Sequence, residues 1–553
     1  MEQFRIIMAV VLSVLVFLVW DFLFIPDSAP PPQQTRETNA PPTPTGETLS
    51  PKAAAVSPPI PAVTQARDLP DKSPAPEIVV ETGLFSVELS GPGACFTRFD
   101  LKKYQETKDE GSPGKRLVSE KNRRGTACVD FMINGAAGDN RPVSYFTDQP
   151  TGTIDATGSA RTLSFFGQVS PGVEIEKRYT FYPDTYAVDL AVMIKNNTDA
   201  PVSGVLDVAL NRYFSGEASR FLFEGPCAFK DGRLEEVKLN DIKDTPSVTG
   251  RLPWIAIQSR YFMSAVVAEQ GEQATMALAY SDDGIVTASY RPALTPVLPR
   301  TVSTSNFKVY LGPKDLGILK AVGHNLDRAV DFGWFDFIAR PCLWLMNQIY
   351  RVIPNYGVAI ILITLIIKLL FWPLGTKSYK SMGEMKRIQP LMAEIREKYK
   401  DDKRKMNEEM MGLYKTYKVN PLGGCLPMLV QIPVFIAFYR MLYQAMALRH
   451  APFLLWINDL SAPERLFSFD ITLPLMQPPT GIPVLTIIMG ATMFLQQKMQ
   501  PAPGDPAQAK IMMLMPIFLT VIFINFPSGL VLYFIVNNLF SIFQQQYVTR
   551  KNS

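Results

Sequence analysis

Residues 355–374 read NYGVAIILITLIIKLLFWPL, and this apolar stretch decides which kind of fold the chain can adopt. A helix of about 20 apolar residues is long enough to cross the hydrocarbon core of a bilayer. Lys368 is the only charged residue in the stretch. The sequence therefore predicts a membrane-spanning helix that carries one cation inside the membrane.

Five further stretches share this apolar character, one of them at the N-terminus, residues 4–25. We expect an uncleaved anchor, residues 1–25, rather than a signal peptide, because the apolar core is long and Pro30–Pro32 occupy the place of a cleavage site. The prediction is a multi-pass α-helical membrane protein with six transmembrane helices, of which five form a core bundle within residues 353–547. The other four stretches are residues 422–446, 482–499, 511–526 and 529–546.

The charges of the loops predict how these spans are oriented. Residues 376–418 contain twelve Lys and Arg against seven acidic residues, whereas residues 449–481 contain only two Lys and Arg. Loops rich in Lys and Arg stay in the cytoplasm. Counting spans from this loop places both termini in the cytoplasm and residues 77–325 on the opposite side of the membrane.

Residues 77–325 alternate apolar and polar side chains with a period of two, as in Phe85-Ser86-Val87-Glu88-Leu89. This pattern, interrupted by turn-forming residues, predicts a large antiparallel β-sandwich. The fourteen prolines of residues 26–76 indicate an extended linker in front of it. No motif fixes a catalytic nucleophile, so we expect a spacer or docking domain. A sugar-acting enzyme is the alternative.

The cysteines and histidines restrict the chemistry of the chain. Five cysteines without a CxxC spacing and two distant histidines predict no metal site. Cys95, Cys128 and Cys227 could form one disulfide, but the sequence leaves the pairing open. The absence of a GxxxxGK[ST] loop and the net charge of +4 argue against nucleotide use and nucleic-acid binding. We expect no cofactor and no enzymatic activity.

Polar residues inside the predicted spans are the candidate functional residues. A charge such as that of Lys368 costs about 2.5–3.5 kcal/mol inside a membrane helix, so it should face water or partners. Thr364 lies one turn earlier on the same helix face. The alternative is that the lysine stem reaches to the cytoplasmic surface. A wet cavity lined by further polar groups is expected, from Gln431, Gln496, Gln497, Asn537, Asn538 and Ser541.

Two amphipathic segments flank the first span of the bundle. Residues 326–352 are rich in aromatic side chains and predict an interfacial helix broken at Pro341, with a buried domain-closing helix as the alternative. Apolar residues at helical spacing in residues 376–418 predict an antiparallel helical hairpin with Lys403, Arg404 and Lys405 at its tip. That hairpin is either a plain solvated structure or a docking platform for a cytoplasmic partner or anionic lipids.

Several dense motifs resemble the YidC family of membrane protein insertases. They are the run from Lys418 through Asn420-Pro421-Leu422-Gly423-Gly424-Cys425 to Gln431 and Pro433, the turn Phe526-Pro527-Ser528-Gly529-Leu530 with Tyr533, the segment Asp327–Trp334, and the closing Gln544-Gln545-Gln546. The resemblance implies a protein of the bacterial inner membrane with a mutarotase-like periplasmic super-sandwich. It would insert and fold inner-membrane proteins, alone or beside the Sec translocon, without covalent chemistry.

The resemblance also implies roles for single residues. Lys368 falls where the family keeps a positive charge, usually arginine, in a hydrophilic groove. Thr364 and Tyr533 match positions along which substrate helices slide, and Phe534 stands in place of a second tyrosine. The hairpin would meet a ribosome or targeting receptor, whereas the short tail, residues 548–553, offers no long basic ribosome-binding segment. A secondary transporter is disfavoured because the spans show no internal repeat.

Overall fold

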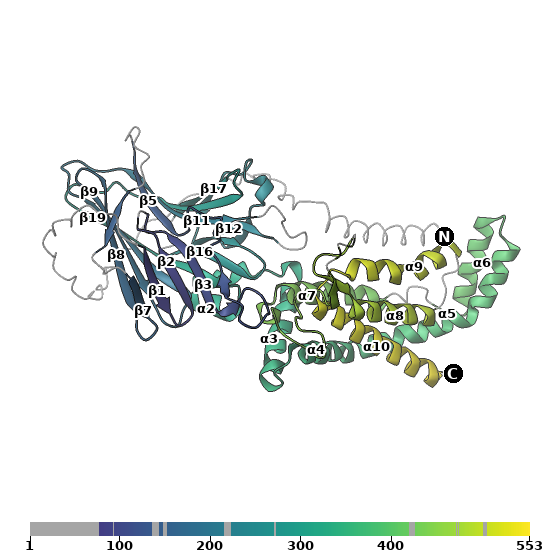
Figure 1. Ribbon diagram of the computed structural model, residues 1–553. Helices are drawn as coiled ribbons and strands as arrows, with labels where there is room; N and C mark the ends of the chain where they lie inside the picture. Colours follow the sequence, from purple (N-terminus) through teal and green to yellow (C-terminus); the bar gives the residue numbers. More distant parts are fainter. Residues whose placement is uncertain are drawn as a thin grey trace, which may run out of the picture. The chain divides into compact units, whose positions relative to one another are not determined.

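The computed structural model describes residues 77–552 except residues 92, 135–142, 148–151, 215–222, 270–272, 418, 420–425, 470, 472, 474 and 501–505 (Figure 1). The predicted anchor, residues 1–25, and the predicted linker, residues 26–76, lie outside the described residues. The whole Asn-Pro-Leu-Gly-Gly-Cys run, residues 420–425, does as well. Within the described part, a β-sandwich is followed along the chain by a helical bundle.

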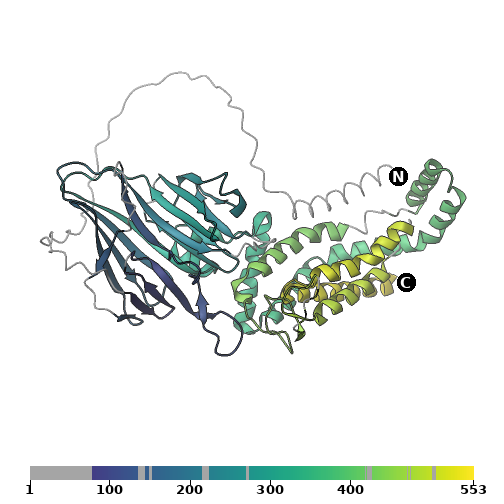
Figure 2. The same cartoon turned by 45° about the horizontal axis from the view of Figure 1, so that its top comes forward.

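The sandwich consists of one nine-stranded sheet and two five-stranded sheets (Figures 1 and 2). The nine-stranded sheet has the order β13 (Arg233–Glu236), β12 (Gly225–Lys230), β15 (Trp254–Gln258), β16 (Phe262–Ala268), β19 (Val302–Pro313), β10 (Ala187–Asn196), β9 (Val173–Phe181), β8 (Arg161–Ser170) and β6 (Tyr145–Thr147). One smaller sheet has the order β4 (Gly114–Arg116), β3 (Phe96–Gln105), β2 (Phe85–Leu89), β1 (Ile78–Thr82) and β7 (Gly152–Ala156). The other has the order β14 (Ser247–Arg251), β17 (Gln273–Tyr280), β18 (Ile285–Pro292), β11 (Gly204–Tyr213) and β5 (Cys128–Ile133).

The alternating pattern predicts the strands well because one side chain in two points into the core. In β9 and β10 the inward positions are buried along nearly the whole strand. The prediction of a wholly antiparallel sandwich is wrong at one edge, where β1 and β7 pair in parallel with Ile78 opposite Gly152. Parallel pairing requires a long connection between the two strands, and residues 83–151 provide it.

A disulfide joins Cys95 to Cys128, which settles the pairing that the sequence left open. The third cysteine of the sandwich, Cys227, is a buried free thiol in β12. The Cys95–Cys128 bond ties the turn before β3 to the start of β5, so it holds together strands of both five-stranded sheets.

An inward position of β9 holds a cation, Lys177, which is fully buried. Its ammonium donates to the carbonyl oxygen of Gly93 at 2.9 Å and lies 3.6 Å from the centre of the Tyr145 ring. The hydroxyl of Tyr179 donates to the neighbouring carbonyl of Ala94 at 2.9 Å. Burial away from water lowers the pKa of Lys177 from its ordinary value of 10.5 to about 7.

We expect the sandwich to gain stability as the pH rises above 7, because of Lys177. Between pH 7 and pH 10.5, Lys177 is protonated in the unfolded chain but not in the folded sandwich. Raising the pH therefore favours folding. The gain from pH 7 to pH 9 should be about 2 kcal/mol. Urea unfolding of the full chain, followed by proteolysis of the sandwich, should show this slope in the wild type and a smaller one in Lys177→Met. Equal slopes in the two proteins would contradict the prediction.

The short helix α2 (Leu316–Val322) closes the sandwich, and α3 (Asp336–Val352) leads into the bundle. The bundle contains α4 (Tyr356–Leu370), α7 (Leu426–Gln444), α8 (Val484–Met499), α9 (Pro506–Phe523) and α10 (Ser528–Asn552). A hairpin of α5 (Trp372–Lys398) and α6 (Lys403–Thr416) is inserted between α4 and α7 (Figure 1). Strands β20 (Leu466–Phe469) and β21 (Thr480–Ile482) form a small hairpin between α7 and α8.

Helices occupy all five of the stretches predicted as spans of the bundle, but the count of six spans is not confirmed. Among the described residues, no single helix combines the length and the apolarity needed to cross a membrane. Helices α4 and α5 meet both requirements only as a pair, and they are bent by 65° where they meet. Lys510–Phe523 within α9 is apolar but short.

One predicted feature, the break in the interfacial helix, differs from the structure. The predicted break at Pro341 is absent, since α3 continues through this residue. Pro341 has no backbone N–H, so the carbonyl of Phe337, four residues earlier, receives no hydrogen bond from it. Phe337 is exposed, and α3 tolerates the loss of this one hydrogen bond. The predicted tail, residues 548–553, is helical as far as Asn552. Arg550 and Lys551 suit the negative end of the α10 dipole.

Candidate functional site

The candidate site lies where α4, α7 and α10 meet. Helix α4 begins at an N-cap, Asn355, whose side chain accepts a hydrogen bond from the backbone of Val358 at 3.1 Å. The same side chain donates to the carbonyl of Phe453 at 3.0 Å, so this end of the helix is held in place. Lys368 lies near the opposite end of α4 and is part-buried.

The ammonium of Lys368 lies among neutral polar groups. It donates to the hydroxyl of Ser541 on α10 at 2.8 Å and to the side-chain oxygen of Gln431 on α7 at 3.4 Å. Gln431 in turn donates to the side-chain oxygen of Asn537 at 2.5 Å. We call these four residues the Lys368 cluster.

The Lys368 cluster has a net positive charge. In the part of the chain that the structure describes, no acidic side chain forms an ion pair with Lys368. A cation held only by amide and hydroxyl oxygens keeps its full attraction for an incoming carboxylate. Its partly buried position strengthens that attraction, because water screens charges less there.

Sequence reasoning named Asn537 and Ser541 among the polar groups of a wet cavity, but it assigned neither of them a contact with Lys368. They are four residues apart on α10 and therefore share one helix face. Ser541 also donates to the backbone oxygen of Asn537 at 2.7 Å. The four-residue spacing of Asn537 and Ser541 was the signal in the sequence that could have placed them on one face of the helix.

Asn538 and Gln496 do not join the Lys368 cluster. Asn538 is buried and donates to the hydroxyl of Thr492 on α8 at 3.2 Å. Gln496 follows Thr492 by one turn and is half-buried, and none of the hydrogen bonds described for the chain links it to Lys368. Asn538 therefore lies on the face of α10 that packs on α8.

Thr364 lies one turn before Lys368 and is buried. Its hydroxyl donates to the backbone oxygen of Ile360 at 2.7 Å, within its own helix. Because that hydroxyl is satisfied locally, Thr364 contributes a small side chain to the face rather than a free polar group.

The two aromatic candidates, Tyr533 and Phe534, differ in how exposed their side chains are. Tyr533 is 2 % exposed and packs on Phe438 with ring centres 4.9 Å apart. Phe534 is half-buried and lies between Phe435 and Phe523, at ring distances of 5.1 and 4.8 Å. Of the two, Phe534 offers the more accessible ring.

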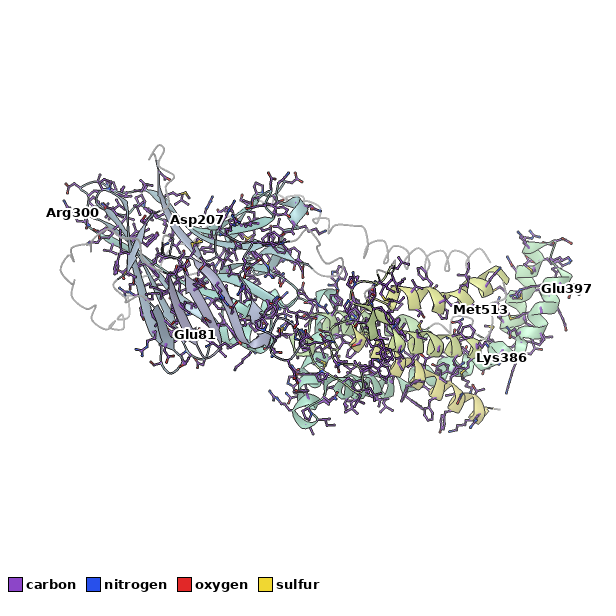
Figure 3. The ribbon with its side chains drawn as sticks, in the orientation of Figure 1. Glu81, Asp207, Arg300, Lys386, Glu397 and Met513 are labelled. Carbon is purple, nitrogen blue, oxygen red and sulfur yellow. A yellow bond between two sulfur atoms is a disulfide. The ribbon has the colours of Figure 1, made fainter. Side chains whose placement is uncertain are left out.

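The hairpin of α5 and α6 presents its basic tip to solvent. Asp402 caps α6 by accepting from the backbone of Arg404 and of Lys405, at 3.1 and 3.0 Å. Lys403, Arg404 and Lys405 are all exposed. Lys386 and Glu397 are charged residues of α5 (Figure 3). The apolar contact between the helices is small, with Ile388 and Met392 buried against partly buried Met410, Leu413 and Tyr414.

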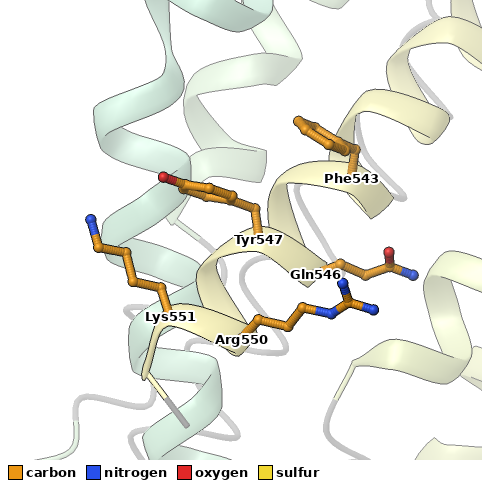
Figure 4. A pocket seen from close by; sticks show the side chains of 5 residues that line it. All are labelled: Phe543, Gln546, Tyr547, Arg550 and Lys551. Atoms are coloured by element: carbon orange, nitrogen blue, oxygen red, sulfur yellow. The ribbon is translucent and has the colours of Figure 1, made fainter.

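A pocket of about 430 Å³ lies beside the last turns of α10 (Figure 4). It is lined by Phe543, Gln546, Tyr547, Arg550 and Lys551. Aromatic rings combined with cations are typical of the level of lipid headgroups. The lining does not include Lys368, so this pocket is separate from the Lys368 cluster.

The chain resembles known proteins along nearly its whole length. The family model described as 60Kd inner membrane protein matches residues 348–553, and the model described as YidC periplasmic domain matches residues 77–345. The membrane protein insertase YidC of Pelobacter propionicus is 38 % identical, with 99 % of each chain covered. That of Syntrophobacter fumaroxidans is 40 % identical, also with 99 % of each chain covered.

Among solved structures, one described as an active YidC insertase with the first transmembrane domain resolved covers 84 % of this chain and 90 % of its own. It is 19 % identical and aligns with a TM-score of 0.34. At that score the superposition carries no argument about this chain.

Proposed function

Because the chain belongs to the YidC family of membrane protein insertases, we propose that it inserts and folds inner-membrane proteins through the Lys368 cluster. The observation that supports this proposal is the position of Lys368, a part-buried cation between three helices whose partners among the described residues are neutral oxygens. Such a cluster lowers the cost of bringing a polar, acidic segment partway across the membrane. It acts by binding, without covalent chemistry or a cofactor.

Lys368 and the residues around it are proposed to have different roles in binding a substrate. Lys368 attracts acidic groups, while Gln431, Asn537 and Ser541 replace part of the water that a polar segment loses. Phe534 is the aromatic ring that a substrate helix can contact as it leaves sideways into lipid. We assign Thr364, Gln496, Asn538 and Tyr533 to shaping and packing the same helices. The membrane potential adds about 2.3 kcal/mol per charge per 100 mV in favour of moving acidic tails outward.

The proposed topology has six spans, with both termini in the cytoplasm and the sandwich in the periplasm. The matched families are an inner-membrane protein and a periplasmic domain. In this topology α4 crosses most of the membrane, and the 65° bend between α4 and α5 is compatible with α5 leaving it on the cytoplasmic side. The exposed side chains of Phe337 and Trp344 on α3, and of Trp334 just before it, suit a helix at the outer membrane surface, while Ala339 and Met346 are buried against the bundle.

Depletion of the chain tests the proposed function. In cells lacking it, newly made one-span and two-span inner-membrane proteins should fail to reach the protease-accessible state, and the wild-type chain should restore them. A chain with residues 80–310 deleted should restore much of this activity, since the Lys368 cluster lies elsewhere. Complete loss on that deletion would favour the rival, a membrane-tethered sugar-acting enzyme. Unchanged insertion after depletion would contradict the proposal.

The bundle is proposed to work alone or beside the Sec translocon. The tip of the hairpin is proposed to contact the ribosome or a targeting receptor. Replacing Lys403, Arg404 and Lys405 together by glutamate should lower insertion roughly threefold, and less so at high salt, because surface charges mainly steer encounters. A reconstituted insertion assay measures this effect. The matched control is Lys415→Glu, on the exposed side of α6 but away from the tip. Wild-type insertion by the triple variant would leave the hairpin as a plain solvated structure.

A further inference from the structure

The segment between α7 and α8 displays apolar side chains outward. Residues 466–482 read LFSFDITLPLMQPPTGI and contain one charged residue, Asp470, and no Lys or Arg. Every second residue from position 467 to 475 is apolar and exposed. The exposed fractions are 69 % for Phe467, 43 % for Phe469, 64 % for Ile471, 45 % for Leu473 and 77 % for Leu475. We call this surface the apolar hairpin.

The apolar hairpin is held in place by its backbone. Thr480 donates to the carbonyl oxygens of Phe469 and Ile471, both at 2.6 Å. Asn525, in the turn after α9, donates to the carbonyl of Leu475 at 2.8 Å and accepts from the backbone of Gln477 at 2.9 Å. The carbonyl groups of Phe469, Ile471 and Leu475 are thus hydrogen-bonded within the protein, whereas the side chains of the five apolar residues are exposed.

Arg465 fixes the base of the apolar hairpin. Its guanidinium donates to the carbonyl of Ile524 at 2.8 Å and to the carbonyl of Pro479 at 3.2 Å. The guanidinium of Arg465 is thus bound to backbone carbonyls, and residues 466–482 themselves contain no Lys or Arg. A surface of this kind cannot bind headgroup phosphates electrostatically, but it can bury itself in a hydrocarbon layer.

The apolar hairpin continues the exposed apolar surface of α9. Ile517, Phe518, Val521 and Ile522 are exposed along the last turns of that helix, directly before Ile524 and Asn525. Met513, an earlier exposed residue of α9, is labelled in Figure 3. If α9 faces lipid, as the proposed function requires, the same lipid layer extends over the hairpin. At 18 residues α9 is about 27 Å long, slightly short of a bilayer core of about 30 Å.

The side of the membrane follows from a contact with the sandwich. The guanidinium of Arg260, between β15 and β16, donates to the carbonyls of Tyr443 at 2.8 Å and Ser461 at 3.2 Å. Ser461 precedes Arg465 by four residues. The apolar hairpin therefore lies at the end of the bundle that contacts the periplasmic sandwich.

We propose that the apolar hairpin is immersed in the outer leaflet of the inner membrane, with Phe467, Ile471 and Leu475 among the phospholipid acyl chains. It extends the short α9 at its outer end and holds that end of the bundle at a fixed depth. The inference rests on the membrane placement in the proposed function, but not on the role of Lys368.

Depth-dependent fluorescence quenching tests this inference. The full chain, with Cys227, Cys342 and Cys425 replaced by alanine, receives a single new thiol by Leu475→Cys and a polarity-sensitive fluorophore on it. Reconstitution uses vesicles of phosphatidylethanolamine and phosphatidylglycerol, with or without lipids that carry a quencher on the acyl chain. Asp282→Cys, in an exposed turn of the sandwich, is the matched control. We expect at least threefold stronger acyl-chain quenching at position 475 than at position 282, and the reverse order for aqueous iodide.

Two outcomes would overturn the inference. Quenching by iodide alone at position 475 would place the hairpin in water. Protection from both quenchers would show that protein covers it, and a dependence of that protection on the protein-to-lipid ratio would identify a second copy of this chain. Neither result would touch the proposed function, which depletion and the Lys368 variants test separately.

Discussion

Replacing Lys368 by glutamate is expected to lower the insertion of substrates with acidic translocated tails at least tenfold. Within the part of the chain that the structure describes, the lysine has only neutral partners, so the exchange turns an attractive centre into a repulsive one. Two charges about 5 Å apart at an effective dielectric constant of about 20 interact by roughly 3 kcal/mol. Partial exposure of the site reduces this energy by screening, which leaves an effect of tenfold or more.

The measurement is insertion into vesicles of two substrates that differ only in the charge of the translocated tail. Lys368→Arg should insert both at nearly the wild-type rate, since it keeps the charge. Lys368→Ala should be intermediate and should affect mainly the acidic tail. Lys377→Glu, an exposed reversal on α5, controls for the change in net charge. Wild-type insertion of the acidic substrate by Lys368→Glu would disprove the electrostatic part of the mechanism.

The same position can be tested for access to water. A cysteine at position 368 should react with a water-soluble thiol reagent added from the cytoplasmic side. Protection at this position, with reaction at an exposed α5 site such as Lys377→Cys, would mean that the cluster is sealed.

Hydropathy predicted a helix at each of the five stretches of the bundle, because long apolar stretches favour helices that bury their backbone hydrogen bonds. It also singled out Lys368, since one charge in such a stretch is unusual. It could not decide between Asn537 and Asn538. Adjacent residues on a helix point about 100° apart, and α10 packs on α4 with one face and on α8 with another. Each asparagine therefore finds a hydrogen-bond partner inside the bundle, and only the packing of the helices shows which one contacts Gln431.

In the sandwich, the period of two predicted the strands but not their partners. The parallel pairing of β1 with β7 joins residues some 70 positions apart, which no local pattern encodes. Lys177 likewise occupies an inward position that the alternation assigns to an apolar residue. It fits there because the carbonyl of Gly93, distant in the sequence, accepts a hydrogen bond from its side-chain nitrogen.

Removal of the Cys95–Cys128 disulfide is expected to destabilise the sandwich by about 4 kcal/mol. The bond closes a loop over a sequence separation of 33, and opening it returns that loop's conformational entropy to the unfolded chain. The Cys95→Ala, Cys128→Ala double variant of the full chain should therefore unfold at lower urea concentration, with proteolysis of the sandwich as the readout. Cys342→Ala, in α3 outside the sandwich, is the control and should leave the midpoint unchanged.

The disulfide and Lys177 should prove to be coupled. Gly93 and Ala94, which accept the hydrogen bonds of Lys177 and Tyr179, directly precede Cys95, so the disulfide holds both acceptors in place. Without it, the turn can move away and leave the buried side-chain nitrogen of Lys177 without its acceptor, which is costly. The loss of the disulfide should therefore cost less in a Lys177→Met background than in the wild type. Strictly additive effects in this double-mutant cycle would show that the turn keeps its position without the disulfide. An unchanged urea midpoint in the cysteine variant would contradict the entropic argument for the disulfide.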